Sequence, residues 1–221
     1  DGGKTQICYK DPLEDPIFQT NKKHLTSTCW DFDFIKRPAA CTLGLTGLGG
    51  IYTRFGTAAG RASGGLTVYR PDHWVFNDTD LYYGDVFGQD PKIASFEVDG
   101  VDYTFRKGLP YPTHLDAAPD TLEILAMTPA VRGEPNHRNY LVNAPLDEFE
   151  AIVSVSRSGL NLIQHESLDH IFGAGMMAVF TRNNGTVFNS GTTEWVAGLL
   201  DNDFFVCQIT RNVLRRLGQS E

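Results

Sequence analysis

Hydrophobic and polar positions alternate with a period of two in several short stretches of the chain. The alternation is clearest around Asp99–Gly100, where five apolar side chains share one face: Phe96, Val98, Val101, Tyr103 and Phe105. Because successive side chains of a strand point to opposite faces, this pattern predicts a β-hairpin that turns at Asp99–Gly100. A second hairpin is predicted from Met176–Phe180 to Thr186–Asn189, closed by Arg182–Gly185, whose Asn-Gly pair supplies positive φ angles.

Further apolar runs bounded by glycine and proline are predicted to be short strands. They are Thr5–Lys10, Thr26–Trp30, Cys41–Thr46, Leu66–Tyr69 and Leu122–Met127. Ala151–Val155 is another compact apolar element, for which periodicity does not decide between strand and helix.

The end of the chain has the period of a helix. Val206, Ile209, Val213 and Leu217 recur at helical spacing, Asp201–Asp203 offers capping oxygens before them, and Gly218 follows. An amphipathic helix that docks on a sheet is therefore expected here.

The composition supports one globular, β-rich unit. The 221 residues are 41% hydrophobic and include 22 Gly, 11 Pro and 14 Phe, which favours many turns and aromatic strands. We find no internal repeat and no linker. The expected fold is α+β: a mixed sheet with β-hairpins and a C-terminal amphipathic helix, with residues 1–221 as a single unit.

The net charge and the cysteines of the chain limit which partners and which cellular location are expected. A formal net charge of -8 would repel phosphate backbones and anionic lipid surfaces, so neither nucleic acid nor a membrane is an expected partner. Four scattered cysteines without a C-x-x-C pair are typical of reduced thiols, which predicts a cytoplasmic location. The first residues, Asp1-Gly2-Gly3, suggest that the chain was cut from a longer polypeptide.

Several common motifs are absent or imperfect. The chain has no G-x-S-x-G elbow and no G-x-x-x-x-G-K-[ST] loop. His165 and His170 come one residue too far apart for H-E-x-x-H, so a regular helix would place them about 140° apart rather than on one face. The acidic stretch Asn77–Asp80, with Asp85 and Asp90 after it, fits either a calcium ligand set or ordinary acidic surface turns.

Glu123 is the strongest candidate for a general acid or base. It interrupts the apolar run Leu122–Met127, and a carboxylate buried in such a run has to be paired, metal-bound or protonated. His114 and Asp116, which precede the run, are candidate catalytic neighbours. The alternative is a structural ion pair between Glu123 and an arginine.

The string Arg70–Trp74 gathers a cation, an acid, an imidazole and an indole in one short turn. Arg70, His73 and Trp74 are therefore candidate substrate-binding residues that would frame a polar pocket. The alternative is an Arg70–Asp72 pair beneath an anchoring Trp74.

Strings in a fixed order along nearly the whole chain resemble the C-terminal domain of the N,N-dimethylformamidase large (beta) subunit-like family. Arg132–Leu168 fits that family's pattern poorly. The strings are Cys8–Pro12, Arg37–Pro38, Thr67–Phe76, Tyr83–Gly88, Glu97–Asp102, Gly108–Thr113, Glu123–Ala126, Pro129–Ala130, Gly185–Phe188, Gly191–Trp195 and Ile209–Leu214.

The resemblance implies hydrolysis of small N-substituted formamides, similar to dimethylformamide, to formate and an amine. It also implies a mononuclear iron held by two tyrosines and a carboxylate, with those ligands upstream of this chain, so no metal ligand is assigned within 1–221. The chain would complete an upstream α/β domain, with a small subunit as a further possible partner in an oligomer. Within the family's pattern, Glu123 corresponds to an acid/base or supporting residue.

A second hypothesis belongs to another class of protein. The aromatic content, the many turns and the acidic stretch also fit a non-catalytic accessory or carbohydrate-binding domain, in which Trp74 or Trp195 would bind a glycan.

Overall fold

The computed structural model describes residues 2–9, 11–28, 30–47, 64–94, 98–131 and 172–218. At its centre is a five-stranded sheet in the order β2-β1-β5-β6-β7, and all its neighbouring strands pair antiparallel. A separate hairpin pairs β3 with β4. The strands are β1 (Leu66–Val68), β2 (Val86–Phe87), β3 (Tyr103–Arg106), β4 (Leu109–Pro112), β5 (Glu123–Val131), β6 (Phe172–Arg182) and β7 (Gly185–Asn189).

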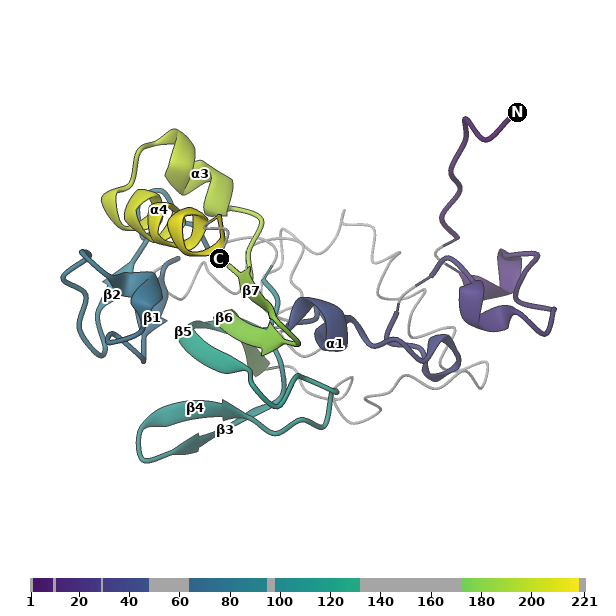
Figure 1. The fold of residues 1–221 in the computed structure, drawn as a ribbon, viewed down its shortest axis with the longest axis horizontal. Helices are drawn as coiled ribbons and strands as arrows, with labels where there is room; N and C mark the ends of the chain where they lie inside the picture. The colour runs from purple at the N-terminus through teal and green to yellow at the C-terminus, as the bar shows by residue number, and fades with distance from the viewer. Residues whose placement is uncertain are drawn as a thin grey trace, which may run out of the picture.

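Within the described residues, three α-helices and four 3-10 helices accompany the strands. In Figure 1, α3 and α4 lie together on one side of the sheet, whereas the β3–β4 hairpin projects on the other side. The α+β, β-rich class is confirmed. The helical elements are α1 (Ala39–Leu43), α3 (Trp195–Leu200), α4 (Phe204–Leu217), η1 (Pro12–Glu14), η2 (Lys23–Leu25), η3 (Asp33–Ile35) and η4 (Trp74–Phe76).

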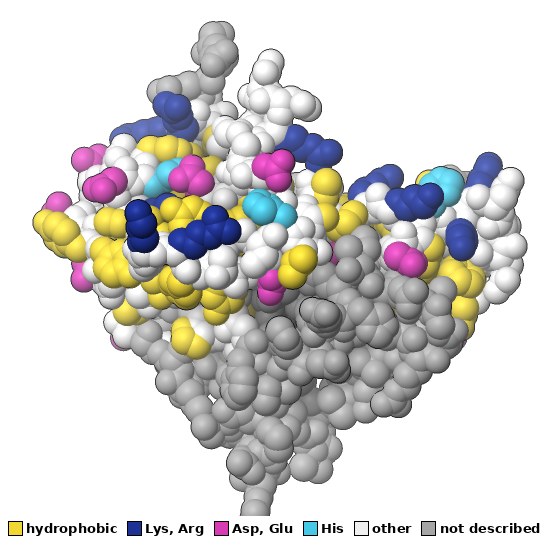
Figure 2. All heavy atoms as spheres, turned by 90° about the horizontal axis from the view of Figure 1, so that it is seen from below, with side chains coloured by type: hydrophobic (Ala, Val, Ile, Leu, Met, Phe, Trp, Pro, Cys, Tyr) yellow, Lys and Arg dark blue, Asp and Glu magenta, His cyan; other side chains and the backbone are white. Residues whose placement is uncertain are grey.

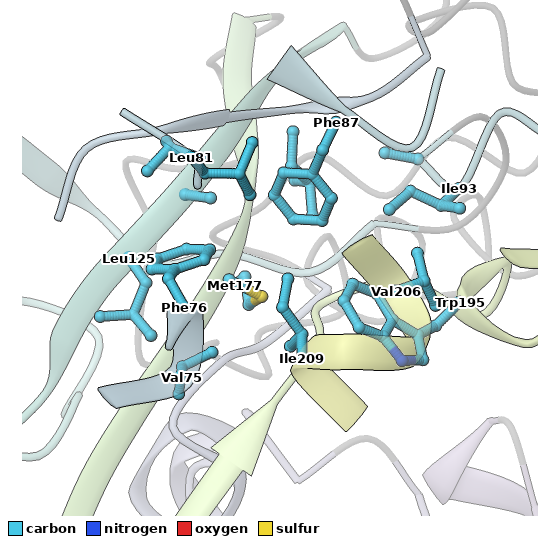
Figure 3. Close-up of a cluster of buried hydrophobic side chains, with 14 of the residues drawn as sticks. Val75, Phe76, Leu81, Phe87, Ile93, Leu125, Met177, Trp195, Val206 and Ile209 are labelled. Atoms are coloured by element: carbon cyan, nitrogen blue, oxygen red, sulfur yellow. The ribbon is translucent and has the colours of Figure 1, made fainter. Parts of the chain in front are cut away.

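The long strands β5 and β6 are covered on both faces. Met177 and Val179 of β6 belong to a cluster with α4, while Met176, Ala178 and Phe180 belong to a second cluster on the opposite face. The first cluster brings Phe87, Leu125 and Met177 from the sheet against Phe76 of η4 and against Val206 and Ile209 of α4 (Figure 3). Burial on both faces explains why these strands are nearly continuous apolar runs rather than alternating ones.

The C-terminal helix forms as predicted. Asp203 caps it by accepting a hydrogen bond from the backbone N–H of Val206 at 2.8 Å, and Gly218 follows its last turn. Asn212 donates to the carbonyls of Val75 and Asn77 at 2.9 and 2.7 Å, which fastens α4 to η4. The helix is therefore held by polar contacts as well as by its apolar face.

The β6–β7 hairpin is confirmed, with Arg182 paired to Gly185 across the turn. The positive φ falls at Asn183, at 54°, rather than at the Asn-Gly pair. Asparagine tolerates this region because its short side chain bonds locally.

The predicted turn at Asp99–Gly100 is wrong. Gly100 bridges to Thr46, and Tyr103 pairs instead with Pro112. The hairpin turns at Lys107–Gly108, where both residues have positive φ. Apolar alternation identified a real strand but not its partner, because the turn chemistry further along fixes the register.

Three strands predicted near the N-terminus are not present in the described residues. Thr5–Lys10 and Thr26–Trp30 have no strand pairing where they are described. Cys41–Thr46 overlaps helix α1, which begins where Asp31 accepts the N–H of Ala39 and ends at Gly44 with φ 82°. These two end signals outweighed the strand propensity of a short segment.

Some sequence features lie outside the described residues: Ala151–Val155, the Arg132–Leu168 segment and the pair His165 and His170. Among the helices that are described, none has the length and apolar character needed to cross a membrane.

Candidate functional site

A β-bulge in β5 sets the geometry of the candidate site. The pairing of β5 with β6 shifts register between Ile124 and Ala126. The Leu125 carbonyl accepts hydrogen bonds from the N–H groups of both Tyr69 and Arg70, at 2.9 and 3.3 Å. The chain leaving β1 is thereby tied to the start of β5, at the kind of irregularity that re-aims side chains.

The Arg70 side chain is half-buried and held by two backbone carbonyls. Its Nε donates to Ile124 O at 3.1 Å and one terminal nitrogen, Nη2, donates to Pro110 O at 3.0 Å. The guanidinium carbon lies 4.9 Å from the centre of the Tyr111 ring, within cation–π range. Among the described residues Nη1 has no hydrogen-bond partner and Arg70 forms no ion pair with Asp72, so an oriented cation with unused donors remains.

His73 follows Arg70 through a tight turn, in which the N–H of His73 donates to Arg70 O at 3.1 Å. Its Nδ1 accepts the N–H of Val75 at 3.3 Å and so caps η4. Burial lowers the pKa of His73 below 6.5, the Glu123 charge raises it, and the Arg70 charge lowers it. The neutral ring consequently carries its proton on Nε2, leaving that N–H as a donor.

Glu123 is the first residue of β5, and its side chain is exposed rather than buried as expected. Its neighbours Leu122 and Ile124 are both buried in the core, so Glu123, at the first position of the strand, lies on the solvent side between them. Its charge nevertheless acts on His73. The structure thus brings together Glu123, His73 and Arg70, three of the predicted residues.

Trp74 lies beside this group. Its ring centre is 5.2 Å from that of His73, and it packs partly buried against the core. Trp74 therefore supports the imidazole from one side.

His114 and Asp116 belong to a loop of their own after β4. Asp116 is fully buried and accepts hydrogen bonds from the N–H groups of Asp102 and Ala118, at 2.6 and 3.4 Å. Burial raises its pKa above 3.8, although both N–H groups lower it. The exposed His114 has its Nδ1 2.9 Å from Ala118 O. Among the described residues, no hydrogen bond or ion pair connects either one to Glu123.

Tyrosines form the part of this surface that sequence reasoning did not single out. The Tyr69 ring contacts those of Tyr83 and Phe105, at 5.7 and 5.5 Å between centres. Burial is the main cause that raises the pKa of Tyr69 and of Tyr103 above 10.0. Seen from the side of the β3–β4 hairpin, hydrophobic side chains form a broad area with basic side chains among them (Figure 2). The available signals were the place of Tyr103 in the apolar alternation that ends at Phe105 and the place of Tyr69 at the end of the predicted strand Leu66–Tyr69.

Across the described ranges, no three or more His, Cys, Asp or Glu side chains gather closely enough to hold an ion. The described His, Cys, Asp and Glu side chains alone therefore do not form a site for an iron ion.

The comparisons with known proteins identify the family. A family model described as "N,N-dimethylformamidase beta subunit-like, C-terminal" matches residues 1–205. No curated protein and no solved structure matches the chain. The matched residues include the β1–η4 turn, the β3–β4 hairpin and the start of β5, and thus the whole cluster of Arg70, His73 and Glu123. The chain therefore belongs to the N,N-dimethylformamidase beta subunit-like family, to its C-terminal domain.

Proposed function

We propose that this chain is part of an amidohydrolase that cleaves small N-substituted formamides, similar to dimethylformamide, into formate and an amine. The observation that carries the proposal is the placement of an exposed carboxylate, Glu123, beside a half-buried imidazole and an oriented guanidinium. The family match supports the class of reaction.

Each group has a role suited to amide hydrolysis. The Nε2–H of His73 and the unused Nη1 of Arg70 are donors for the amide carbonyl oxygen, on which negative charge develops in the transition state. The Glu123 carboxylate takes a proton from the attacking water and passes it to the leaving amine nitrogen. Water thus supplies hydroxide to the carbonyl carbon and a proton to nitrogen as the C–N bond breaks.

The remaining parts of the enzyme are proposed to lie outside this chain. They are the upstream portion of the same large subunit, with its iron, and a small subunit. The free thiols of Cys8, Cys41 and Cys207 suit the reducing cytoplasm, which we propose as the location.

The test is Glu123→Gln in the complete enzyme, with dimethylamine release from dimethylformamide as the readout. Removing a general acid or base should lower kcat by about 10²- to 10⁴-fold, while an exposed position should leave the unfolding midpoint unchanged. Glu14→Gln is the matched control, since Glu14 is also exposed but lies in η1. Wild-type turnover in Glu123→Gln would remove Glu123 from the mechanism.

A second candidate function is a non-catalytic binding domain for carbohydrate. The exposed rings of Tyr83 and Phe105, 55% and 48% accessible, favour it. Trp195 does not contribute, because it is buried and donates to Thr210. Oligosaccharide-dependent NMR shifts that are confined to these two rings, together with a lack of amide turnover, would favour this function.

A further inference from the structure

A second guanidinium accompanies Arg70 at the β3–β4 hairpin. The guanidinium carbon of Arg70 lies 4.9 Å from the centre of the Tyr111 ring, and that of Arg106 lies 5.7 Å from the same centre. Arg106 pairs with Leu109, and Tyr111 lies two residues further along β4, on the same face of the hairpin. Two cations from different parts of the chain therefore lie within cation–π range of one ring.

These cations and the phenol have unused hydrogen-bonding groups. The Arg106 side chain and the Tyr111 hydroxyl have no hydrogen-bond partner among the described residues, and Nη1 of Arg70 has none either. Nor does any described carboxylate form an ion pair with Arg70 or Arg106, although the chain has a net charge of -8. Like charges that gather without a counter-charge repel one another, so this group of side chains is complementary to an anion.

The free donors indicate the kind of anion. A guanidinium presents its N–H groups in a planar fork that matches the two oxygens of a carboxylate, and a phenol donates one hydrogen bond more. Arg70 has already given Nε and Nη2 to backbone carbonyls, so Arg106 is the guanidinium of this pair whose whole fork is free. One free fork suits a singly charged carboxylate better than a doubly charged phosphate. Arg106 is exposed and Tyr111 is half-buried, which lets a small molecule reach both.

We propose that Arg106 and Tyr111 form a carboxylate subsite, so that the formamide hydrolysed at the neighbouring cluster carries a carboxylate on its nitrogen substituent, as an N-formyl amino acid does. The inference rests on the proposed function, in which Nη1 of Arg70 holds the amide carbonyl oxygen. Arg70 joins the two parts of the site, because its guanidinium also lies beside the Tyr111 ring.

N-formylglycine illustrates the fit. Only the nitrogen and one carbon separate its formyl carbon from its carboxylate carbon, a spacing that neighbouring guanidiniums on one ring are suited to span. Water gives hydroxide to the formyl carbon and a proton to the nitrogen as the C–N bond breaks, which yields formate and glycine.

The first test compares two substrates of nearly equal size in the complete enzyme, with formate release as the readout. They are N-formylglycine and its neutral analogue N-formylglycinamide. The wild type should have a kcat/KM about tenfold higher for N-formylglycine, because the neutral analogue cannot form the charge-assisted pair. Arg106→Met should reduce this ratio to about one. Lys107→Met is the matched control, since it removes the same charge from the next residue, which is also exposed, and it should keep the wild-type ratio.

The second test does not depend on turnover. Acetate, which has a carboxylate but no amide, is titrated into the full chain while the NMR signals of the Arg106 Nε–H and the Tyr111 ring are followed. Saturable shifts in the wild type and in Lys107→Met, with no shift of the Tyr111 ring in Arg106→Met, support the subsite.

The outcomes separate the subsite from the proposed hydrolysis. Equal kcat/KM values for the two substrates in the wild type would overturn the subsite and leave the hydrolysis intact. An equal loss of the ratio in Lys107→Met would also overturn it, because the preference would then come from general charge attraction. Formate from neither substrate would overturn the hydrolysis instead, and the acetate titration would decide the subsite: saturable shifts support it, and their absence overturns it.

Discussion

Two polar clusters border the β3–β4 hairpin, one around Arg70 and Glu123 and the other around Asp116. They differ in whether their polar atoms remain available to a ligand. In the first, Glu123 is exposed and Arg70 keeps an unused nitrogen. In the second, Asp116 is fully buried, and its carboxylate accepts hydrogen bonds from two backbone N–H groups. The residue types are alike, but only the first cluster is open to a ligand.

The two carboxylates differ in exposure because of their positions relative to the hydrophobic core. Glu123 lies on the solvent side of β5, so water solvates it and no buried partner is required. Asp116 lies inside a tight loop with positive φ at His114 and Ala117, where two N–H groups would otherwise be buried without acceptors. A shifted pKa accompanies the structural carboxylate here, so such a shift alone does not identify an active site.

The largest expected effect is on stability, from Asp116→Ala. It removes the acceptor of two N–H groups in the interior, and should lower the free energy of unfolding by about 2–4 kcal/mol. Urea denaturation measures it. Asp120→Ala is the control, because Asp120 is fully exposed four residues away and should change nothing measurable. A small loss in Asp116→Ala would mean that the loop is not held as the structure shows.

Arg70→Met should have an intermediate effect. The methionine keeps much of the stem but leaves the carbonyls of Ile124 and Pro110 without their donor, which costs about 1–2 kcal/mol at a half-buried site. Arg106→Met is the control: Arg106 also lies near the Tyr111 ring, at 5.7 Å, but is exposed. Equal unfolding midpoints for the two variants would show that Arg70 does not fasten β5 to β4.

The elements that sequence predicted best have their determinants within themselves. Helix α4 contains its period and its cap at Asp203, and the β6–β7 hairpin contains its turn at Asn183. The strand predicted for Cys41–Thr46 became a helix because its start depends on Asp31, a residue outside the segment. Tertiary capping of this kind leaves no local signal.

The candidate site was predictable only in part, for the same reason. Arg70 and His73 lie in one turn, so their proximity is local. Their proximity to Glu123 depends on the bulge in β5 and on the pairing of β1 with β5. Both are long-range features, and the apolar run around Glu123 suggested burial, whereas Glu123 lies on the solvent side between its buried neighbours.

A smaller effect is the pH dependence of stability that the buried Asp116 causes. Because burial raises the pKa of Asp116 above 3.8, the folded state holds a proton that the unfolded chain has already lost. Its contribution to stability is full below pH 3.8 and is lost as pH rises through the folded-state pKa. The wild type should therefore lose stability relative to Asp116→Asn across this window. Urea denaturation at successive pH values measures the difference, and a difference that stays constant or rises with pH would contradict the raised pKa.

The smallest effect concerns His73 and tests whether the open cluster is coupled. The pKa of His73 is lowered by burial and raised by the Glu123 charge, so Glu123→Gln should lower it further. The unfolded chain then binds more protons than the folded one below pH 6.5, and stability falls as the pH falls through that window. NMR titration of the imidazole Hε1 signal gives the pKa directly, and Glu14→Gln is the control. An unchanged His73 pKa in Glu123→Gln would mean that the carboxylate is too well solvated to act on the imidazole. Glu123 and His73 would then be electrostatically independent, and the proposal that they act together on one amide substrate would lose the coupling that supports it.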